Sequence, residues 1–161
     1  VVTYDDFGDY GHPDHIMAHR VTMAAVAAAA DPAHPGGPTW DVAKVYWTAT
    51  PRSVLSAGYD AVAARDDVDF DVADEPAFGV ADEVVTTVVA APEQVDAKRT
   101  ALAAHATQVL VDGDFFALSN RLGRVLSGVE HYRLVRGERG ETGPDGRETD
   151  LFAGVPAEVG P

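Results

Sequence analysis

The chain begins with Val1–His15, VVTYDDFGDYGHPDH, and this stretch decides the expected fold. The apolar, β-branched residues of Val1–Tyr4 predict a short buried strand. The polar residues and two glycines of Asp5–His12 predict a loop, and Pro13 favours the first turn of a helix, where its missing N–H is not needed. Proteins of the α/β class commonly present their chemistry at such a junction, beyond the carboxyl end of a strand and beside the N–H groups that open a helix.

The residues after Pro13 predict a helix and a second strand. Asp14–Ala30 has helical spacing, and the Pro- and Gly-rich segment 31–38 ends it. We expect this helix to bury one face, formed by Ile16, Val21, Ala24, Ala25 and Ala28. Val42–Thr48 is typical of a strand, so the strand, helix and strand are expected to form one βαβ unit.

Helices and strands continue to alternate through the rest of the chain. The expected helices are Pro51–Ala64, Pro92–Val109 and Asp114–Leu126, and the expected strands are Val84–Ala91 and, at a sheet edge, Glu130–Val135. The acidic segment 65–82 predicts irregular structure, and the charged, Gly-rich segment 136–147 predicts an exposed hairpin or loop. This order of elements predicts the α/β class.

Length and cysteine content limit the kind of protein. The 161 residues suit one domain or part of a larger protein. The first residue already lies inside an expected strand, so we expect the chain to be the C-terminal part of a longer protein. Cysteine is absent, which excludes disulfides and leaves His and Asp as the plausible metal ligands.

Charge and hydropathy argue against two classes of partner. The formal charge of −14 disfavours binding to nucleic acid and to anionic membrane surfaces. No apolar run approaches the ~20 residues of a membrane span, and no signal-peptide pattern is recognisable. These features predict a soluble, cytoplasmic enzyme.

Two histidines at helical spacing suggest a metal site. His15 and His19 stand four residues apart, as on the zinc-binding helix of the zincins, but that motif has Glu directly after its first His and this chain has Ile16. The run His12–His15, HPDH, places an acid and an imidazole in the first turn of a helix, where unpaired N–H groups and the helix dipole favour an anion. These residues alone leave helix capping and catalysis equally open.

The longer pattern from Tyr4 to His15 resembles the second signature of the LmbE/PIG-L family of zinc-dependent N-acetylglucosaminide deacetylases. Later segments resemble the branch of that family that acts in mycothiol biosynthesis: KVYWT at 44–48, AAHATQV at 103–109, ALSN at 117–120 and EHY at 130–132. The similarity runs from Val1 to about Ala153. It implies the C-terminal part of a Rossmann-like α/β fold. Residues 1–50 would end the catalytic domain, and residues 51–161 would form a smaller α/β subdomain that walls the substrate cleft.

The resemblance also implies roles for four residues. His15 would be a zinc ligand, and His12 would stabilise the tetrahedral intermediate or protonate the leaving amine. Asp14 would hydrogen-bond His12 and fix its tautomer and charge. Tyr10 would point its phenol at the substrate carbonyl and help to stabilise the oxyanion.

The implied cofactor is one Zn²⁺ per active site. The implied substrate is a small amino sugar, N-acetylglucosaminyl-inositol, whose acetamide is hydrolysed. The first signature of the family, an Ala-His-Pro-Asp-Asp-Glu run, supplies the other zinc ligands and the general base; we expect it upstream of Val1, and we expect the present chain alone to be inactive. Two alternatives stay open: a mycothiol S-conjugate amidase of the same fold, and a metal-free relative that serves as an interaction domain.

Two loop residues depart from the family pattern. Phe7 stands where members usually have Asn, and Asp9 stands where they usually have Gly. Phe7 removes a turn-forming amide, and Asp9 adds a charge beside Tyr10. The resemblance therefore implies the metal ligand but not the conformation of the loop.

The remaining histidines have weaker claims to function. His19 is expected to pack near the site or support it rather than to bind the metal. His105 is equally consistent with lining a sugar pocket and with packing on its helix. His131 and its neighbour Tyr132 are expected to pack within a strand, and His34 is expected to lie exposed in a loop.

Three aromatic and two acidic residues complete the set of candidates. Trp40, Trp47 and Tyr46 are able to stack on a sugar, but aromatic residues beside a strand are more often core, so we expect packing. Asp5 and Asp6 either shape the mouth of the pocket or cap the turn.

Overall fold

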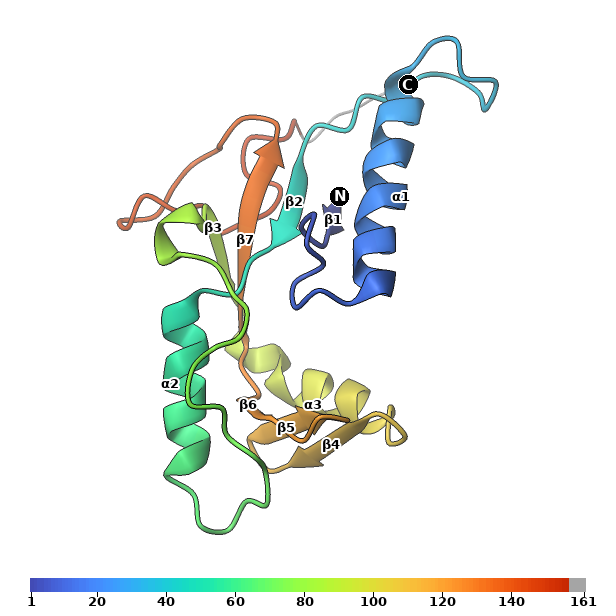
Figure 1. The fold of residues 1–161 in the computed structure, drawn as a ribbon. Coiled ribbons are helices and arrows are strands. Elements are labelled where there is room, and N and C mark those ends of the chain that lie inside the picture. The colour runs from blue at the N-terminus through green and yellow to red at the C-terminus, as the bar shows by residue number, and fades with distance from the viewer. Residues whose placement is uncertain (157–161) are drawn as a thin grey trace.

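Two β-sheets form the framework of the protein (Figure 1). The computed structural model describes residues 1–156. Within this range the larger sheet has the strand order β1-β2-β7-β3 and the smaller sheet the order β4-β5-β6. The strands are β1 (Val2–Thr3), β2 (Val45–Thr48), β3 (Thr87–Ala90), β4 (Val109–Asp112), β5 (Phe115–Leu118), β6 (Gly123–Val125) and β7 (Val129–Arg136), and the helices are α1 (Pro13–Ala30), α2 (Arg52–Ala63) and α3 (Val95–Ala103). The expected α/β class is confirmed.

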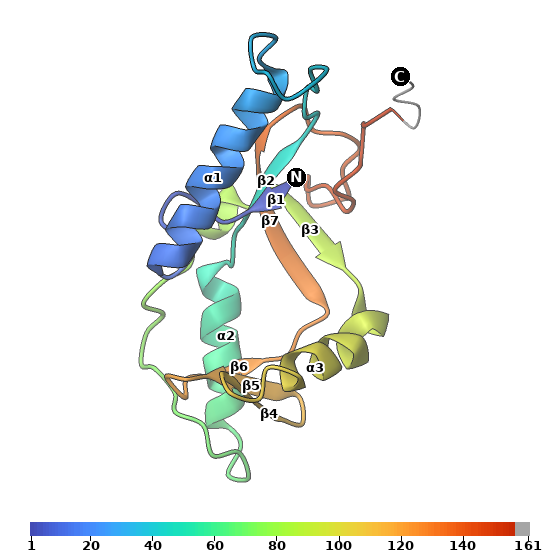
Figure 2. The ribbon, with the colours of Figure 1, turned by 90° about the vertical axis from the view of Figure 1, so that its right-hand side faces the viewer.

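The elements fall into an upper and a lower group in Figures 1 and 2. Helix α1 stands beside the larger sheet, and α2 and α3 lie with the smaller sheet. Strand β7 rises from the lower group into the larger sheet and so connects the two. The later half of the chain thus completes the sheet that β1 and β2 begin. A domain boundary at residue 50 stays a prediction, and the last five residues of the expected second part lie outside the described range.

The expected βαβ unit at the start of the chain is confirmed. β1 and β2 pair in parallel, with Val2 opposite Tyr46 and Thr3 opposite Trp47, and α1 connects them. Helix α1 begins at Pro13, as its sequence predicts, and ends at Ala30.

The buried face of α1 differs from the expected one. Val26 is the residue that the helix buries, whereas Val21 is 59% exposed. The helix carries alanine on all of its faces, so the spacing of its apolar residues does not predict which face is buried.

Strand β7 was expected at a sheet edge, and this prediction is wrong. It lies between β2 and β3 and pairs with both in antiparallel fashion. Tyr132 is opposite Thr48 on one side and Thr87 on the other. An edge and a central position differ in the pairing of backbone groups rather than in side-chain pattern, so the sequence did not distinguish them.

The helix expected over 114–126 is also wrong, because this segment forms β5 and β6. Asp112 pairs with Phe115, so Gly113 and Asp114 form a two-residue hairpin turn, with Gly113 at φ +56°. Glycine at the first position is a favoured sequence for such turns. The same hairpin shortens the expected helix 92–109, since α3 ends at Ala103 and Val109–Asp112 becomes strand β4.

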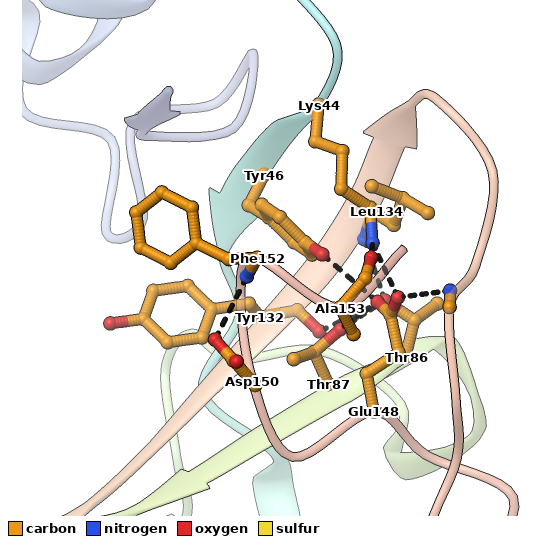
Figure 3. Close-up of polar contacts among 11 residues, drawn as sticks. Lys44, Tyr46, Thr86, Thr87, Tyr132, Leu134, Glu148, Asp150, Phe152 and Ala153 are labelled. Atoms are coloured by element: carbon orange, nitrogen blue, oxygen red, sulfur yellow. Dashed lines mark hydrogen bonds and ion pairs between the residues drawn. The ribbon is translucent and has the colours of Figure 1, made fainter. Parts of the chain in front are cut away.

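A buried polar cluster fastens the C-terminal segment to the larger sheet (Figure 3). Lys44 and Glu148 form an ion pair at 2.5 Å and are 6% and 0% exposed. Glu148 also accepts hydrogen bonds from the Tyr46 hydroxyl, the Thr87 hydroxyl and the Gly140 N–H, at 3.0, 2.9 and 2.7 Å. Lys44 donates to the Ala153 carbonyl at 2.7 Å.

Segment 136–147 is mainly exposed and turns back on itself, as expected. The Gly143 N–H donates to the Arg147 carbonyl, and Thr142 bridges Glu148 in antiparallel fashion. None of the helices within residues 1–156 combines the length and apolar character needed to cross a membrane.

Candidate active site

Glycine and acidic residues shape the Asp5–His12 loop. Gly8 is buried at φ +73°, and a Cβ there would lie 2.8 Å from the Ile16 nitrogen, so a side chain does not fit. The Gly8 N–H donates to the Asp5 carbonyl, and the Asp5 carboxylate accepts from the Asp9 N–H at 2.9 Å. Asp9 itself has φ +63°, a left-handed conformation that Gly adopts more readily. The loop therefore folds tightly onto the first turn of α1.

Three of the four expected site residues gather at this junction. The rings of Tyr10 and His15 have centroids 5.0 Å apart, those of His12 and His15 5.0 Å, and those of Tyr10 and His12 6.0 Å. Tyr4, at the end of the first strand segment, stacks on His15 with the ring planes 4° apart and the centroids at 4.0 Å. The residue that follows β1 thus stacks on His15, beside which the rings of Tyr10 and His12 also lie.

His15 is oriented through one ring nitrogen. Its Nδ1 lies 3.3 Å from the Gly8 carbonyl oxygen, and in the tautomer with hydrogen on Nδ1 this nitrogen donates to the carbonyl. Nε2 then carries the free lone pair, which is how metal-binding histidines are commonly held. His15 thus fits the role of a metal ligand. Within residues 1–156 no group of three or more His, Asp or Glu side chains is arranged to hold a metal ion.

His12 is both the N-cap of α1 and a member of the ring cluster. Its Nδ1 accepts a hydrogen bond from the Asp14 backbone N–H at 3.1 Å. An accepting Nδ1 places the hydrogen of the neutral ring on Nε2, which becomes a donor. The contact with Asp14 is therefore made by its backbone. The Asp14 side chain is exposed, and no bond from its carboxylate to His12 is found among the described residues.

Burial controls the charge of two groups around the rings. Burial raises the pKa of the Tyr4 phenol, and the nearby Asp9 carboxylate raises it further, so Tyr4 stays neutral beside His15. Burial also raises the pKa of Asp9, although the positive charge of Arg124 acts in the opposite direction. The ring that stacks on His15 is thus neutral, and burial shifts the Asp9 carboxyl toward its protonated form.

One cavity adjoins this junction and a second lies beyond it, and Tyr10, His12 and His15 are in the lining of neither. The smaller cavity, of about 280 Å³, lies between the Asp5–His12 loop and the segments that precede and follow α2. Its lining is Asp5, Phe7, Asp9, Thr48, Ala49, Thr50, Arg52, Ala77, Phe78, Gly79 and Val80. The larger, of about 510 Å³, lies among α2, β5–β7 and Lys98 of α3. Thr48 and Thr50 line both, and the Thr48 hydroxyl oxygen is buried without a hydrogen-bond partner among residues 1–156. The two spaces meet at the end of β2.

The other histidines lie farther from the ring cluster or play packing roles. His19 Nδ1 lies 2.9 Å from the Tyr4 carbonyl oxygen, and its ring meets Trp47 edge-on at 5.1 Å, so it fastens α1 to the sheet. His105 is exposed in a turn and lines neither cavity, and His34 is exposed as expected. His131 is half-buried in the wall of the larger cavity, where burial and then Arg147 lower its pKa and favour the neutral ring.

The remaining candidates divide between core and surface. Tyr46 is 1% exposed and belongs to the core, Trp47 is half-buried against α1, and Trp40 is 55% exposed. The Asp5 carboxylate both caps the turn and lines the smaller cavity, so the two readings of this residue are compatible. Asp6 is exposed.

Two residues near the rings were not identified from the sequence. The Phe78 ring meets Tyr10 edge-on with centroids 6.1 Å apart, and the Arg124 guanidinium lies 4.8 Å from the Phe78 centroid. Phe78 stands in the irregular segment 65–82, and Arg124 stands in the segment expected to be a helix. Nothing in their local sequence points to the loop.

Comparison with curated proteins finds several relatives that carry the same name. The chain is 55% identical, over 97% of its length, to the 1D-myo-inositol 2-acetamido-2-deoxy-alpha-D-glucopyranoside deacetylase of Geodermatophilus obscurus. It is 51% identical over 96% of its length to the protein of that name from a Nocardioides species, and 50% identical over 97% to the one from Thermomonospora curvata. It covers 54% of each, so the chain spans about half the length of the curated relatives it matches. No protein-family model matches the chain.

Proposed function

Because the chain belongs to the same family as the 1D-myo-inositol 2-acetamido-2-deoxy-alpha-D-glucopyranoside deacetylases, we propose that it forms part of a longer zinc-dependent enzyme of that activity. The reaction is hydrolysis of the acetamide of N-acetylglucosaminyl-inositol, as in mycothiol biosynthesis. A cytoplasmic location and the absence of nucleic-acid and membrane partners remain expectations from composition.

His15 is the residue of this chain that would hold the zinc ion. The observation that carries the proposal is its setting: Nδ1 faces the Gly8 carbonyl, and the rings of Tyr10 and His12 stand 5.0 Å away. Zinc would supply Lewis acidity toward the amide carbonyl. A hydrolytic zinc has about three protein ligands, so the others, with the general base, come from residues outside this chain.

His12 and Tyr10 would act on the substrate. When its Nδ1 accepts from the Asp14 N–H, His12 carries the hydrogen of its neutral ring on Nε2 and would donate a hydrogen bond to the oxyanion. Only the cationic ring would give a proton to the leaving amine. Tyr10, 39% exposed on a loop with two glycines at positive φ, has the freedom to bring its phenol to the substrate carbonyl. The two side chains together supply hydrogen bonds where negative charge develops.

Asp14 would act when His12 becomes cationic. Protonation turns Nδ1 into a donor, which no longer accepts from the Asp14 N–H. The Asp14 carboxylate, two residues along the chain, is then a suitable acceptor and favours the charged ring.

Zinc analysis tests whether the zinc ligands are shared between this chain and the rest of a longer protein. After dialysis, the 161-residue chain should retain far less than one zinc per molecule, whereas the longer protein should retain one and release acetate from N-acetylglucosaminyl-inositol. Tightly bound, stoichiometric zinc in the 161-residue chain would contradict the proposal that further ligands lie outside it. A longer protein that neither retains zinc nor releases acetate would favour a metal-free interaction domain.

A further inference from the structure

Arg124 links the smaller sheet to the proposed catalytic phenol. It lies on β6, more than a hundred residues beyond the Asp5–His12 loop, yet its guanidinium carbon is 4.8 Å from the Phe78 ring centroid. Phe78 in turn meets Tyr10 edge-on at 6.1 Å. A cation, a phenyl ring and the phenol thus form one chain of contacts between the two halves of the molecule.

Packing holds the Arg124 end of this chain of contacts in place. The neighbouring residue Gly123 is buried against α2, and a Cβ there would lie 2.8 Å from Val62 and 2.9 Å from Phe70. Arg124 pairs with Phe116 across the β5–β6 ladder. The backbone from which the Arg124 side chain extends therefore has no room to shift toward α2.

The Phe78 end is held equally closely. Gly79 has φ +97°, and a Cβ there would lie 2.7 Å from Leu55. The Val80 N–H donates to the Thr50 carbonyl and the Arg52 N–H to the Val80 carbonyl, both at 3.0 Å. These bonds fasten the segment beside Phe78 to the start of α2, so the ring that faces Tyr10 is anchored.

Tyr10, by contrast, has a partly exposed side chain on a tightly turned loop. Gly8, Asp9 and Gly11 all have positive φ, and the phenol side chain is 39% exposed. A phenol that donates to an oxyanion must be held close to its productive position, and the ring of Phe78 offers a fixed neighbour on one side. The Arg124 guanidinium lies over the Phe78 ring and contributes a cation–π attraction that steadies it.

We propose that Arg124 is a positioning residue, which holds Tyr10 in place through Phe78. The inference rests on the role proposed above for Tyr10. It adds that the C-terminal sheet determines how well that phenol is placed, so Arg124 acts on turnover without itself touching the substrate.

The test is a set of double variants in the longer enzyme, assayed for acetate release from N-acetylglucosaminyl-inositol. Arg124→Met and Phe78→Leu should each lower kcat about 10-fold, since misplacement of a catalytic group by a fraction of an ångström is costly. KM should change less than about 2-fold. In a Tyr10→Phe background the same substitutions should change kcat by less than about 2-fold, because residues that act through one another are not additive.

Arg65→Met is the matched control. Arg65 lies 5.5 Å from the Phe115 ring centroid, an arrangement of the same kind that does not involve Tyr10. This variant should keep the kcat of the unsubstituted enzyme. Arg124→Lys keeps the charge and is a smaller change, so it should lower kcat less than Arg124→Met. It replaces Arg124→Met in the test if that variant does not fold.

Several outcomes would overturn the inference. A full 10-fold loss of kcat in the Tyr10→Phe background would show that Arg124 does not act through the phenol, and a rise in KM at constant kcat would make it a substrate-binding residue. Nuclear Overhauser contacts between the Phe78 and Tyr10 rings provide a readout that needs no activity: they should weaken in Arg124→Met, and their persistence would also refute the proposal. Failure of the proposed function itself would appear separately, as a Tyr10→Phe enzyme with an unaltered rate.

Discussion

Glu148→Gln should strongly destabilise the chain. The carboxylate is fully buried and receives four hydrogen bonds, from Lys44, Tyr46, Thr87 and the Gly140 N–H. The substitution keeps the size and shape of the side chain but removes its charge. Lys44, which is 6% exposed, then remains as a buried cation without a counter-charge.

Two independent estimates give a similar loss. Hydrogen bonds to a charged group contribute about 1.5–3 kcal/mol and neutral ones about 0.5–1.5 kcal/mol. The bond from Lys44 keeps its charged donor, so the three bonds from Tyr46, Thr87 and Gly140 become neutral and together weaken by roughly 4 kcal/mol. Removing one partner of a buried ion pair costs about 3–5 kcal/mol by direct comparison with other proteins. We therefore expect the free energy of unfolding to fall by about 4 kcal/mol at pH 7.

Urea unfolding followed by far-UV circular dichroism measures this loss. Glu138→Gln is the matched control, because Glu138 is exposed in the same segment and the change removes the same charge; its effect should stay within about 0.5 kcal/mol. Adding Lys44→Met to Glu148→Gln should recover part of the stability, since the uncompensated cation is gone. A loss from Glu148→Gln no larger than that from Glu138→Gln would refute the reasoning.

The effect should also depend on pH. Burial by itself would raise the pKa of Glu148, but the bonds from Lys44, Gly140, Thr87 and Tyr46 outweigh burial and hold that pKa below the usual value. A carboxyl whose pKa is depressed by folding adds stability above its ordinary pKa and loses that contribution as the pH falls through its folded-state pKa. The difference between the unsubstituted chain and Glu148→Gln should therefore narrow below about pH 4.

Four further predictions concern the loop and the first turn of α1. In the longer protein, His15→Ala should lose zinc and turnover together, whereas His12→Ala should keep zinc and lose turnover; metal analysis beside the acetate assay separates them, and loss of zinc from His12→Ala would exchange the two roles. Tyr10→Phe should lower kcat and kcat/KM by about 10²-fold with little change in KM, as expected for a donor that acts in the transition state; a rise in KM alone would make Tyr10 a sugar-contact residue. Asp14→Asn should lower kcat by at least about 10-fold and alter the pH–rate profile through His12, whereas a normal rate and profile would limit Asp14 to its backbone contact. Asp9→Gly should keep zinc content and turnover. The free energy of unfolding should change by less than about 1 kcal/mol, because relief of backbone strain at φ +63° offsets the greater freedom of Gly in the unfolded chain. Thermal unfolding measures the stability, and a collapse of turnover would show that the Asp9 carboxylate takes part in the reaction.

Local rules were sufficient for the first third of the fold and for the core of the candidate site. The apolar start, the two glycines and Pro13 specify strand, loop and helix by short-range preferences, and the structure has these elements in the predicted order and place. The expected burial of the strand is wrong, because Val1 and Val2 are 52% and 45% exposed and only Thr3 of β1 is buried. Tyr10, His12 and His15 lie within six residues of one another, so a tight loop running into a helix is enough to bring their rings together.

Only the tertiary structure decided the arrangement of the later elements. Segment 114–126 has a composition compatible with a helix, but the turn at Gly113 and burial of Phe115 and Ala117 against neighbouring elements make it a hairpin. Strand β7 is central because β2 and β3 both offer free backbone groups to it, which its own side chains do not reveal.

The same limit applies to contacts between distant parts of the chain. The partnership of Lys44 with Glu148, and that of Arg124 with Phe78, joins residues that are far apart in sequence. Their strength depends on burial and on mutual distance, and these quantities exist only after the backbone between them has folded. The sequence by itself therefore determined which residues were suited to the chemistry, whereas the fold determined which distant residues hold them in position.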